Sequence, residues 1–274
     1  MATFKIAAQL YTLRDYCLTK DDLFETLRRL CDMGYDGVEL EDMHKAADPA
    51  ELASFLKKIG FRVCCTRNKY GRTEFDLDGM LREAELYGTP FMGVGTTSCE
   101  QTIHAGPDGP LNYGAYMTQL TEKARARGII PQYDLRSHEF LRDKENGLAF
   151  LRSPGTPFPI EKILASTPQD FHFTADSWYV RCASLTVPEV LNLLKGRCDI
   201  FRFRDNKITL NELDFYRAQL DPCECGEGVM DFESWLPSLE TAGVKWIALG
   251  QEFCTKDPFR CMEISLKNVH AMLN

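Results

Sequence analysis

The chain alternates between short apolar runs and longer segments in which apolar residues recur every three or four positions. The short runs predict β-strands and the longer segments predict amphipathic helices, because these elements have periods of 2 and 3.6 residues. Each predicted strand is followed by a predicted helix. The eight strand candidates are Lys5–Leu10, Gly37–Leu40, Arg62–Thr66, Phe91–Gly95, Ile129–Leu135, Phe171–Asp176, Asp199–Arg204 and Lys245–Leu249.

Capping residues mark the ends of the predicted helices. The segment Asp21–Met33 is closed by Gly34, and the segment Pro49–Ile59 begins after Asp48 and ends at Gly60. An aspartate before the first turn, a proline within it and a glycine after the last turn are typical of helix ends. The other predicted helices start near Asp76, Leu111, Val187 and Asp231, each ends at a glycine, and a last helix spans Pro258–Leu273.

Eight consecutive strand–helix units predict an α/β fold, a single (β/α)8 barrel that forms one domain over residues 1–274. A doubly wound sheet more often stops at five or six strands. The longest irregular stretch, Arg142–Pro159, is predicted to be a long loop after the fifth strand that contains part of a helix and is not a domain linker.

The charge balance narrows the classes of partner. The chain has 32 Lys+Arg against 40 Asp+Glu, a net charge of -8, which argues against nucleic acid and against anionic membrane surfaces. No run of about 18 apolar residues occurs, and charged residues follow the start too soon for a signal peptide, so we expect a cytoplasmic protein. The 11 cysteines lie mostly in apolar stretches, which indicates free thiols. Cys223 and Cys225 alone are weak support for zinc.

In a (β/α)8 barrel the active site forms at the C-terminal ends of the strands. Polar residues at those positions are therefore candidates for function, and many of them are charged. They are Gln9, Tyr11, Glu39, Arg67, Glu100, Asp134, Arg136, Glu139, Asp176, Arg202, Arg204, Gln251 and Glu252.

Seven short motifs resemble, in their order and spacing, the xylose isomerase-like TIM-barrel sugar isomerases and epimerases, and the resemblance covers essentially the whole chain. It implies a fold of that type and activity on a sugar or sugar phosphate. The motifs are QLYTLRD at Gln9–Asp15, GYDGVEL at Gly34–Leu40, YDLRSHEF at Tyr133–Phe140, TADSW at Thr174–Trp178, FRFRD at Phe201–Asp205, GEG at Gly226–Gly228 and GQEF at Gly250–Phe253.

The resemblance implies one divalent cation held by Glu, Asp, His and Glu side chains. Glu139 and Asp176 match two of these ligands, but Arg202 stands at the histidine position and Gly250 at the second glutamate position. A guanidinium has no lone pair for a metal, so we expect a degenerate metal site and no cofactor. If a divalent cation (Mn, Co, Mg or Zn) is retained, its ligands would be Glu139, Asp176, Glu252 and Asp134.

Arginine also occupies other strand ends where the resemblance implies histidine or lysine, namely Arg67, Arg136 and Arg204. Because guanidinium groups suit carboxylate and phosphate oxygens, one hypothesis is a metal-free pocket for an anionic sugar. In this hypothesis Glu139 or Asp176 transfers a proton next to a carbonyl, while Arg202 and Arg136 stabilise the developing charge. The predicted substrate-binding residues are Arg67, Arg136, Arg204, Gln251, Glu39, Trp178 and Tyr11.

Other hypotheses remain open. The arginines can instead pair with carboxylates, Arg202 with Asp176 and Arg136 with Glu139, and fill a site that has lost its metal. The protein would then be a non-catalytic barrel that binds a carbohydrate or anion, or the partner subunit of an active relative. A lyase acting on an oxidised sugar starts with the same proton abstraction. The expected partner is a small carbohydrate or an anionic derivative, and homo-oligomers are typical of such barrels.

Overall fold

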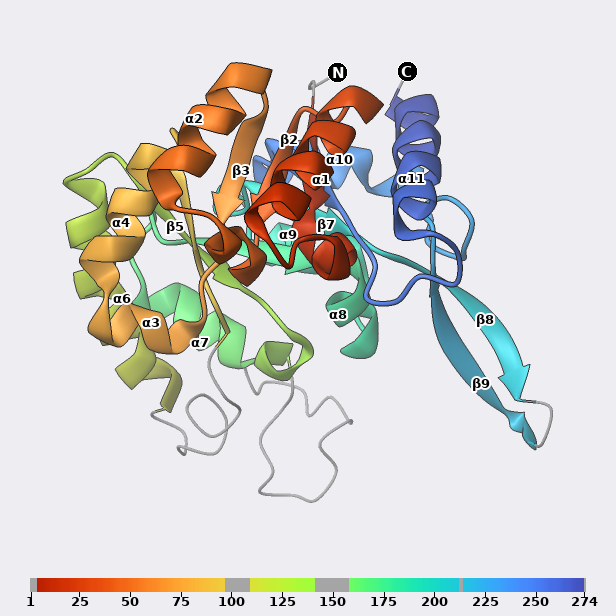
Figure 1. Ribbon diagram of the computed structural model, residues 1–274. Helices are drawn as coiled ribbons and strands as arrows, with labels where there is room; N and C mark the ends of the chain where they lie inside the picture. Colours follow the sequence, from red (N-terminus) through yellow and green to blue (C-terminus); the bar gives the residue numbers. More distant parts are fainter. Residues whose placement is uncertain (1–3, 97–108, 141–157, 212–213, 274) are drawn as a thin grey trace.

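The computed structural model describes residues 4–96, 109–140, 158–211 and 214–273, and its centre is a closed barrel of eight parallel strands (Figure 1). The strands follow the order β1-β10-β7-β6-β5-β4-β3-β2. The predicted (β/α)8 barrel is confirmed, and each predicted strand end is correct to within one residue. The strands are β1 (Lys5–Gln9), β2 (Gly37–Leu40), β3 (Arg62–Thr66), β4 (Phe91–Val94), β5 (Ile130–Asp134), β6 (His172–Asp176), β7 (Ile200–Phe203) and β10 (Trp246–Leu249).

Helices surround the barrel, and their ends follow the capping pattern of the sequence (Figure 1). In α2 the Asp48 carboxylate accepts hydrogen bonds from two backbone amides of the first turn, and Gly60 ends the helix with φ +72°. The α-helices are α1 (Lys20–Met33), α2 (Pro49–Ile59), α3 (Tyr70–Phe75), α4 (Leu77–Leu86), α6 (Gly109–Arg125), α7 (Pro159–Ser166), α8 (Ser177–Cys182), α9 (Val187–Leu193), α10 (Leu236–Ala242) and α11 (Pro258–Leu273). Short 3-10 helices are η1 (Leu10–Tyr16), η2 (Asp42–Ala46), η3 (Ser137–Phe140) and η5 (Glu233–Trp235).

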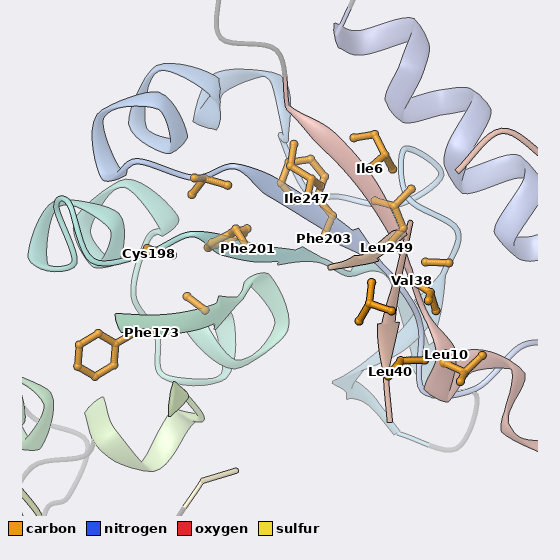
Figure 2. Close-up of a cluster of buried hydrophobic side chains, with 14 of the residues drawn as sticks. Ile6, Leu10, Val38, Leu40, Phe173, Cys198, Phe201, Phe203, Ile247 and Leu249 are labelled. Carbon is orange, nitrogen blue, oxygen red and sulfur yellow. The ribbon is translucent and has the colours of Figure 1, made fainter. Parts of the chain in front are cut away.

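The apolar core has two parts, because successive strand residues face opposite sides of the barrel wall. The larger part lies between strands and helices, where Figure 2 shows Ile6, Val38, Phe201 and Ile247 from four adjacent strands. The smaller part is a separate cluster of other strand residues and includes Ala7, Cys64, Ile200, Trp246 and Ala248.

An antiparallel hairpin that the sequence analysis missed follows β7 and projects away from the barrel (Figure 1). It consists of β8 (Asp205–Asn211) and β9 (Asp214–Cys223), with Ile208 opposite Leu220. We expected the chain to pass from the seventh strand to a helix without another strand, and this expectation was wrong. The only signal in β8 is the alternation of polar and apolar residues from Lys207 to Leu210.

The base of the hairpin is held by the Asp205 carboxylate. It accepts hydrogen bonds from the backbone amides of Gly226 and Gly228, both at 3.0 Å, and of Met230 at 3.1 Å. A Cβ atom at Gly228 would lie 2.2 Å from the Asp205 carboxylate, so only glycine fits this position. The GEG motif therefore closes the hairpin onto β7.

Ten cysteines lie in the described part of the chain, and all are free thiols. Seven of them are buried, in agreement with the prediction that most cysteines are free thiols in apolar stretches. Within the described residues, no helix is long and apolar enough to cross a membrane.

A partly buried ion pair between Arg72 of α3 and Glu83 of α4 gives a pH-dependent contribution to stability. Burial raises the pKa of Glu83, but the nearby His44, whose Nε2 lies 3.7 Å from the carboxylate, and hydrogen bonds from Arg72 outweigh this effect and lower the pKa to about 2. A lowered carboxyl pKa stabilises the fold above the unfolded value of about 4.3, and this stabilisation is lost as pH falls from there to about 2. We expect Glu83→Gln to flatten the fall of the unfolding free energy in that range by about 2 kcal/mol.

Urea denaturation at several pH values measures this difference. The control is Glu51→Gln, whose pair with Lys20 is about half exposed to solvent. Identical pH profiles for wild type and Glu83→Gln would contradict the assignment.

Candidate functional site

Polar side chains occupy the barrel interior at the C-terminal ends of five strands. The interior of such a barrel is usually filled with layers of branched aliphatic residues, so this set is a departure from the rule. All five are at most 2% exposed, and they are Gln9, Glu39, Asp134, Asp176 and Arg202.

Arg202 on β7 reaches across the barrel to β2 and β5. Its guanidinium donates from Nε to Glu39 Oε2 at 2.9 Å and from Nη2 to Glu39 Oε1 at 2.6 Å. Nη1 donates to Asp134. The strands between β7 and β2 carry Ala248 and Ala7 in register with Arg202. Their small side chains leave room for the long side chain of Arg202.

Three guanidinium groups converge on the Asp134 carboxylate. Besides Arg202, Arg67 approaches Oδ2 with Nη2 at 2.5 Å, and Arg136 does so with Nη2 at 2.9 Å. Burial alone would raise the pKa of Asp134, but the three positive charges hold it well below its usual range. Asp134 is therefore ionised throughout the neutral range.

The charges of this cluster cancel. Arg67 also pairs with Glu41, and Arg136 donates to the Tyr179 hydroxyl while its guanidinium lies 4.4 Å from the centre of that ring. Together with Glu39 and Asp134, Glu41 supplies three carboxylates for the three guanidinium groups. The hypothesis that these arginines leave a positively charged pocket is therefore not supported.

The carboxylate partners also differ from those that the sequence suggested. Arg202 pairs with Glu39 and Asp134 in place of Asp176. The Arg136 side chain binds Asp134, and only its backbone amide donates to Glu139, at 2.9 Å. Which carboxylate each arginine contacts depends on the distances between side chains across the barrel, and these distances cannot be derived from the sequence.

Glu139 lies in a separate buried network. Its carboxylate accepts hydrogen bonds from the Tyr133 hydroxyl at 2.5 Å and the Thr96 hydroxyl at 3.1 Å, and lies 2.8 Å from His138 Nε2. The side chain is fully buried. Each Glu139 oxygen thus accepts a hydrogen bond from a nearby residue of the chain, Oε1 from the Tyr133 hydroxyl and Oε2 from the Arg136 backbone amide.

The residues present do not fit the divalent cation that the resemblance implies. Arg202 fills the expected histidine position with a positive charge, and a Cβ atom at Gly250 would lie 2.4 Å from Gln9 Oε1. A glutamate at position 250 would therefore displace Gln9. The alternative ligand set of Glu139, Asp176, Glu252 and Asp134 is not assembled, since no metal-binding group of three or more His, Cys, Asp or Glu exists among the described residues.

A second cluster forms around Arg204, also on the C-terminal side of β7. Its Nη2 donates to Gln9 Oε1 at 2.8 Å, its Nη1 lies 3.1 Å from Glu252 Oε2, and its Nε lies 3.1 Å from Asp176 Oδ2. Arg204 is only 6% exposed, whereas the Glu252 side chain is 39% exposed. Arg204 is thus held from three sides, with one carboxylate partner facing solvent.

Arg204 and Glu252 line a cavity of about 360 Å³ at the mouth of the barrel. Trp178 and Phe253 provide aromatic walls, and Leu220 and Pro222 of the β8–β9 hairpin form another side. Small-molecule sites typically have volumes of about 300–1,000 Å³ and combine apolar walls with a few polar groups. We refer to this space as the mouth cavity.

Local hydrogen bonds fix the loop and helix that border the mouth cavity. The Trp178 backbone amide donates to Asp176 Oδ1 at 2.9 Å, which caps α8. The Gln251 backbone amide donates to Thr12 Oγ1 at 3.0 Å, and its side chain donates to the Phe253 carbonyl at 3.0 Å. Hydrogen bonds therefore fix both the start of α8 and the loop after β10, which border the mouth cavity.

The structure brings the predicted site residues into separate groups. Arg67, Arg136, Arg202 and Glu39 share the Asp134 network, whereas Trp178, Arg204 and Gln251 line the mouth cavity. Tyr11 stacks against Arg14, with the guanidinium 4.6 Å from the ring centre. Glu100 lies outside the described residues. Sequence reasoning missed Glu41, Tyr179, Phe253 and the hairpin residues. Glu41 directly follows β2, so its place at a strand end was a signal that could have found it, whereas Tyr179 and Phe253 lie three and four residues beyond β6 and β10.

Comparison with known proteins supports the fold. No protein-family model and no curated protein sequence matches the chain. A sugar phosphate isomerase/epimerase from Parabacteroides distasonis has 18% identity and a TM-score of 0.74, over 99% of this chain and 95% of that one. An L-ribulose 3-epimerase has 12% identity and a TM-score of 0.70, over 99% and 95% of the two chains. The IOLI protein, solved with a bound zinc atom, has 14% identity and a TM-score of 0.70, with 98% of both chains covered.

These likenesses span nearly the full length of both chains in each pair. The chain therefore has the xylose isomerase-like TIM-barrel fold, as the motif order implied. Because the sequence identities are below 20%, these likenesses show the arrangement of strands and helices only. The chemistry has to be inferred from the residues of the site.

The buried network makes Arg202 a large contributor to stability. Arg202→Met would leave Glu39 and Asp134 buried without their main counter-charge, so we expect the unfolding free energy to fall by about 3–5 kcal/mol. Urea denaturation measures this loss. The control Arg127→Met removes a surface pair with Glu85 and should leave stability nearly unchanged. Similar small effects for both variants would show that the network is not a stabilising unit.

Because the residues of the site do not fit a divalent cation, we expect divalent metal ions not to stabilise the folded protein. A cation that bound the folded protein would raise the melting temperature. We expect excess MnCl2 or MgCl2 to leave the thermal unfolding curve unchanged. A rise in the wild type that disappears in Glu252→Gln would identify a retained metal site and refute the expectation.

Proposed function

We propose that the protein binds a small carbohydrate or an anionic sugar derivative in the mouth cavity and moves a proton next to its carbonyl, as a sugar isomerase or epimerase does. The observation that carries this proposal is the pairing of Arg204 with Glu252 on the cavity wall, at 3.1 Å. Proton transfer next to a carbonyl needs a base for the carbon and a positive group for the oxygen. The likeness in fold to a sugar phosphate isomerase/epimerase and an L-ribulose 3-epimerase supports the same reaction class.

The residues of the mouth cavity suit the two roles. The Glu252 carboxylate takes the proton from the carbon, and the Arg204 guanidinium donates a hydrogen bond to the oxygen that gains negative charge. Return of the proton to the neighbouring carbon completes an isomerisation, provided that the hydroxyl proton of the intermediate passes to the oxygen that carried the negative charge. Asp176 and Gln9 hold Arg204 in place, so the positive group needs no rearrangement when the charge develops.

This proposal changes the roles that the sequence suggested. Asp176 becomes a positioning residue for Arg204, while Glu139 and Arg202 belong to buried networks with partners of their own. Trp178 offers an aromatic face for the apolar side of a sugar ring, and Gln251 offers an amide to a hydroxyl group.

Elimination is a variant of the same proposal. It begins with the same proton abstraction by Glu252, and the protonated Glu252 then gives this proton to a hydroxyl group on the next carbon, which leaves as water. Such a lyase would act on an oxidised sugar, whose carboxylate can accept hydrogen bonds from Arg204.

A non-catalytic barrel is the second candidate. It is favoured by the complete pairing of Arg67, Arg136 and Arg202 with carboxylates of the chain itself. A network of this kind fills the centre of the mouth, and the mouth cavity beside it remains open to a ligand. Such a protein would bind a carbohydrate or serve as the partner subunit of an active enzyme.

Exchange of carbon-bound protons with deuterated water tests the proposal. NMR would follow a panel of aldoses, ketoses, their phosphates and their acids with the purified protein. We expect exchange next to the carbonyl of at least one member, slowed about 100-fold or more in Glu252→Gln because the base is lost. The control Glu233→Gln, on the exposed surface of η5, should keep the wild-type rate.

The spectra also separate the alternatives. Loss of a hydroxyl group together with exchange would identify the lyase. Exchange at the wild-type rate in Glu252→Gln would assign the proton transfer to another group. Saturable binding of a sugar without exchange in any member of the panel would favour the non-catalytic barrel.

A further inference from the structure

An open groove lies at the end of the barrel opposite the mouth cavity. It has a volume of about 1040 Å³ and lies between α2, the end of α4 and the first residues of β1, β3, β4 and β10. Residues at this face of a (β/α)8 barrel usually serve stability, so a large open space there needs a separate explanation. We refer to it as the basal groove.

The charged residues that line the basal groove are all basic. They are Lys5, Lys57, Arg62 and Lys245, although the chain as a whole has more acidic than basic residues. Lys245 pairs with Asp199 Oδ1 at 2.7 Å. The other three form no ion pair with any residue that the structure describes. Their positive charges therefore remain available to a ligand and make the groove attractive to an anion.

Aromatic side chains form the floor between these cations. Trp246 lies below the start of β2, where a Cβ atom at Gly37 would be 3.1 Å from the indole. The Lys5 ammonium lies 5.3 Å from the centre of the Trp246 ring, and the Lys245 ammonium lies 5.4 Å from that of Phe91. The groove thus combines an apolar floor with a rim of cations.

We propose that the basal groove binds an organic anion that joins an aromatic or acyl body to a carboxylate, sulfonate or phosphate group. The body packs on Trp246 and Phe91, and the anionic group lies among Lys5, Lys57 and Arg62. Charge complementarity selects the anion, because no acidic side chain lines the groove in the described part of the chain. The site is independent of the mouth cavity and of the reaction proposed there.

Two fluorescent probes test this proposal with the full-length protein. Anilinonaphthalene sulfonate has an aromatic body with a negative charge, and phenylnaphthylamine is its uncharged analogue. We expect one saturable sulfonate site that added NaCl weakens, and clearly weaker binding of the uncharged analogue. In the double variant Lys57→Glu with Arg62→Glu, the sulfonate Kd should rise about tenfold or more, because two attractive charges become repulsive.

Lys123→Glu is the control, since it reverses an exposed charge on α6, away from the groove, and should keep the wild-type Kd. Thermal unfolding verifies that each variant is folded, and if the double variant is not, the salt titrations of both probes on the wild type decide. The proposal is overturned if charge reversal leaves the sulfonate Kd unchanged, if the uncharged analogue binds equally well, or if no saturable site exists.

Discussion

The ion pairs of Arg202 with Glu39 and Asp134 set the character of the barrel mouth. Burying a charge without a counter-charge costs several kcal/mol, so a fully buried arginine can persist only if carboxylates meet it inside the barrel. Asp134 meets three guanidinium groups, and Arg202 donates three hydrogen bonds of normal length to Glu39. These constraints couple β2, β3, β5 and β7 through side chains in addition to the backbone ladder.

The same network moves the candidate site away from the barrel axis. With the centre filled, the space that remains open lies beside β7, between the β8–β9 hairpin and the loop after β10. Gln9 connects the two regions, because its Oε1 accepts from Arg204 and its Nε2 donates to Glu41 at 3.4 Å. Gln9 therefore links the central network to Arg204 at the mouth cavity through hydrogen bonds.

The sequence predicted the barrel well because its signals are local. Strand runs, the Asp48 cap and the glycine that ends α2 all depend on neighbouring residues, and the structure confirms them. The hairpin escaped prediction because its alternation in β8 spans only a few residues. The partners of Arg202 also escaped prediction, since they come from strands more than 60 residues away in the chain. Pairing of the arginines with carboxylates was one of the open hypotheses, but the sequence did not identify the carboxylates that Arg202 contacts.

A double-mutant cycle between Arg202 and Glu39 tests the central claim most directly. The free energies of unfolding are measured for the wild type, Arg202→Met, Glu39→Gln and the double variant. If the two residues form one unit, the double variant should be more stable than the sum of the single losses predicts, with a coupling of about 2 kcal/mol. Additive losses within about 0.5 kcal/mol would contradict the account.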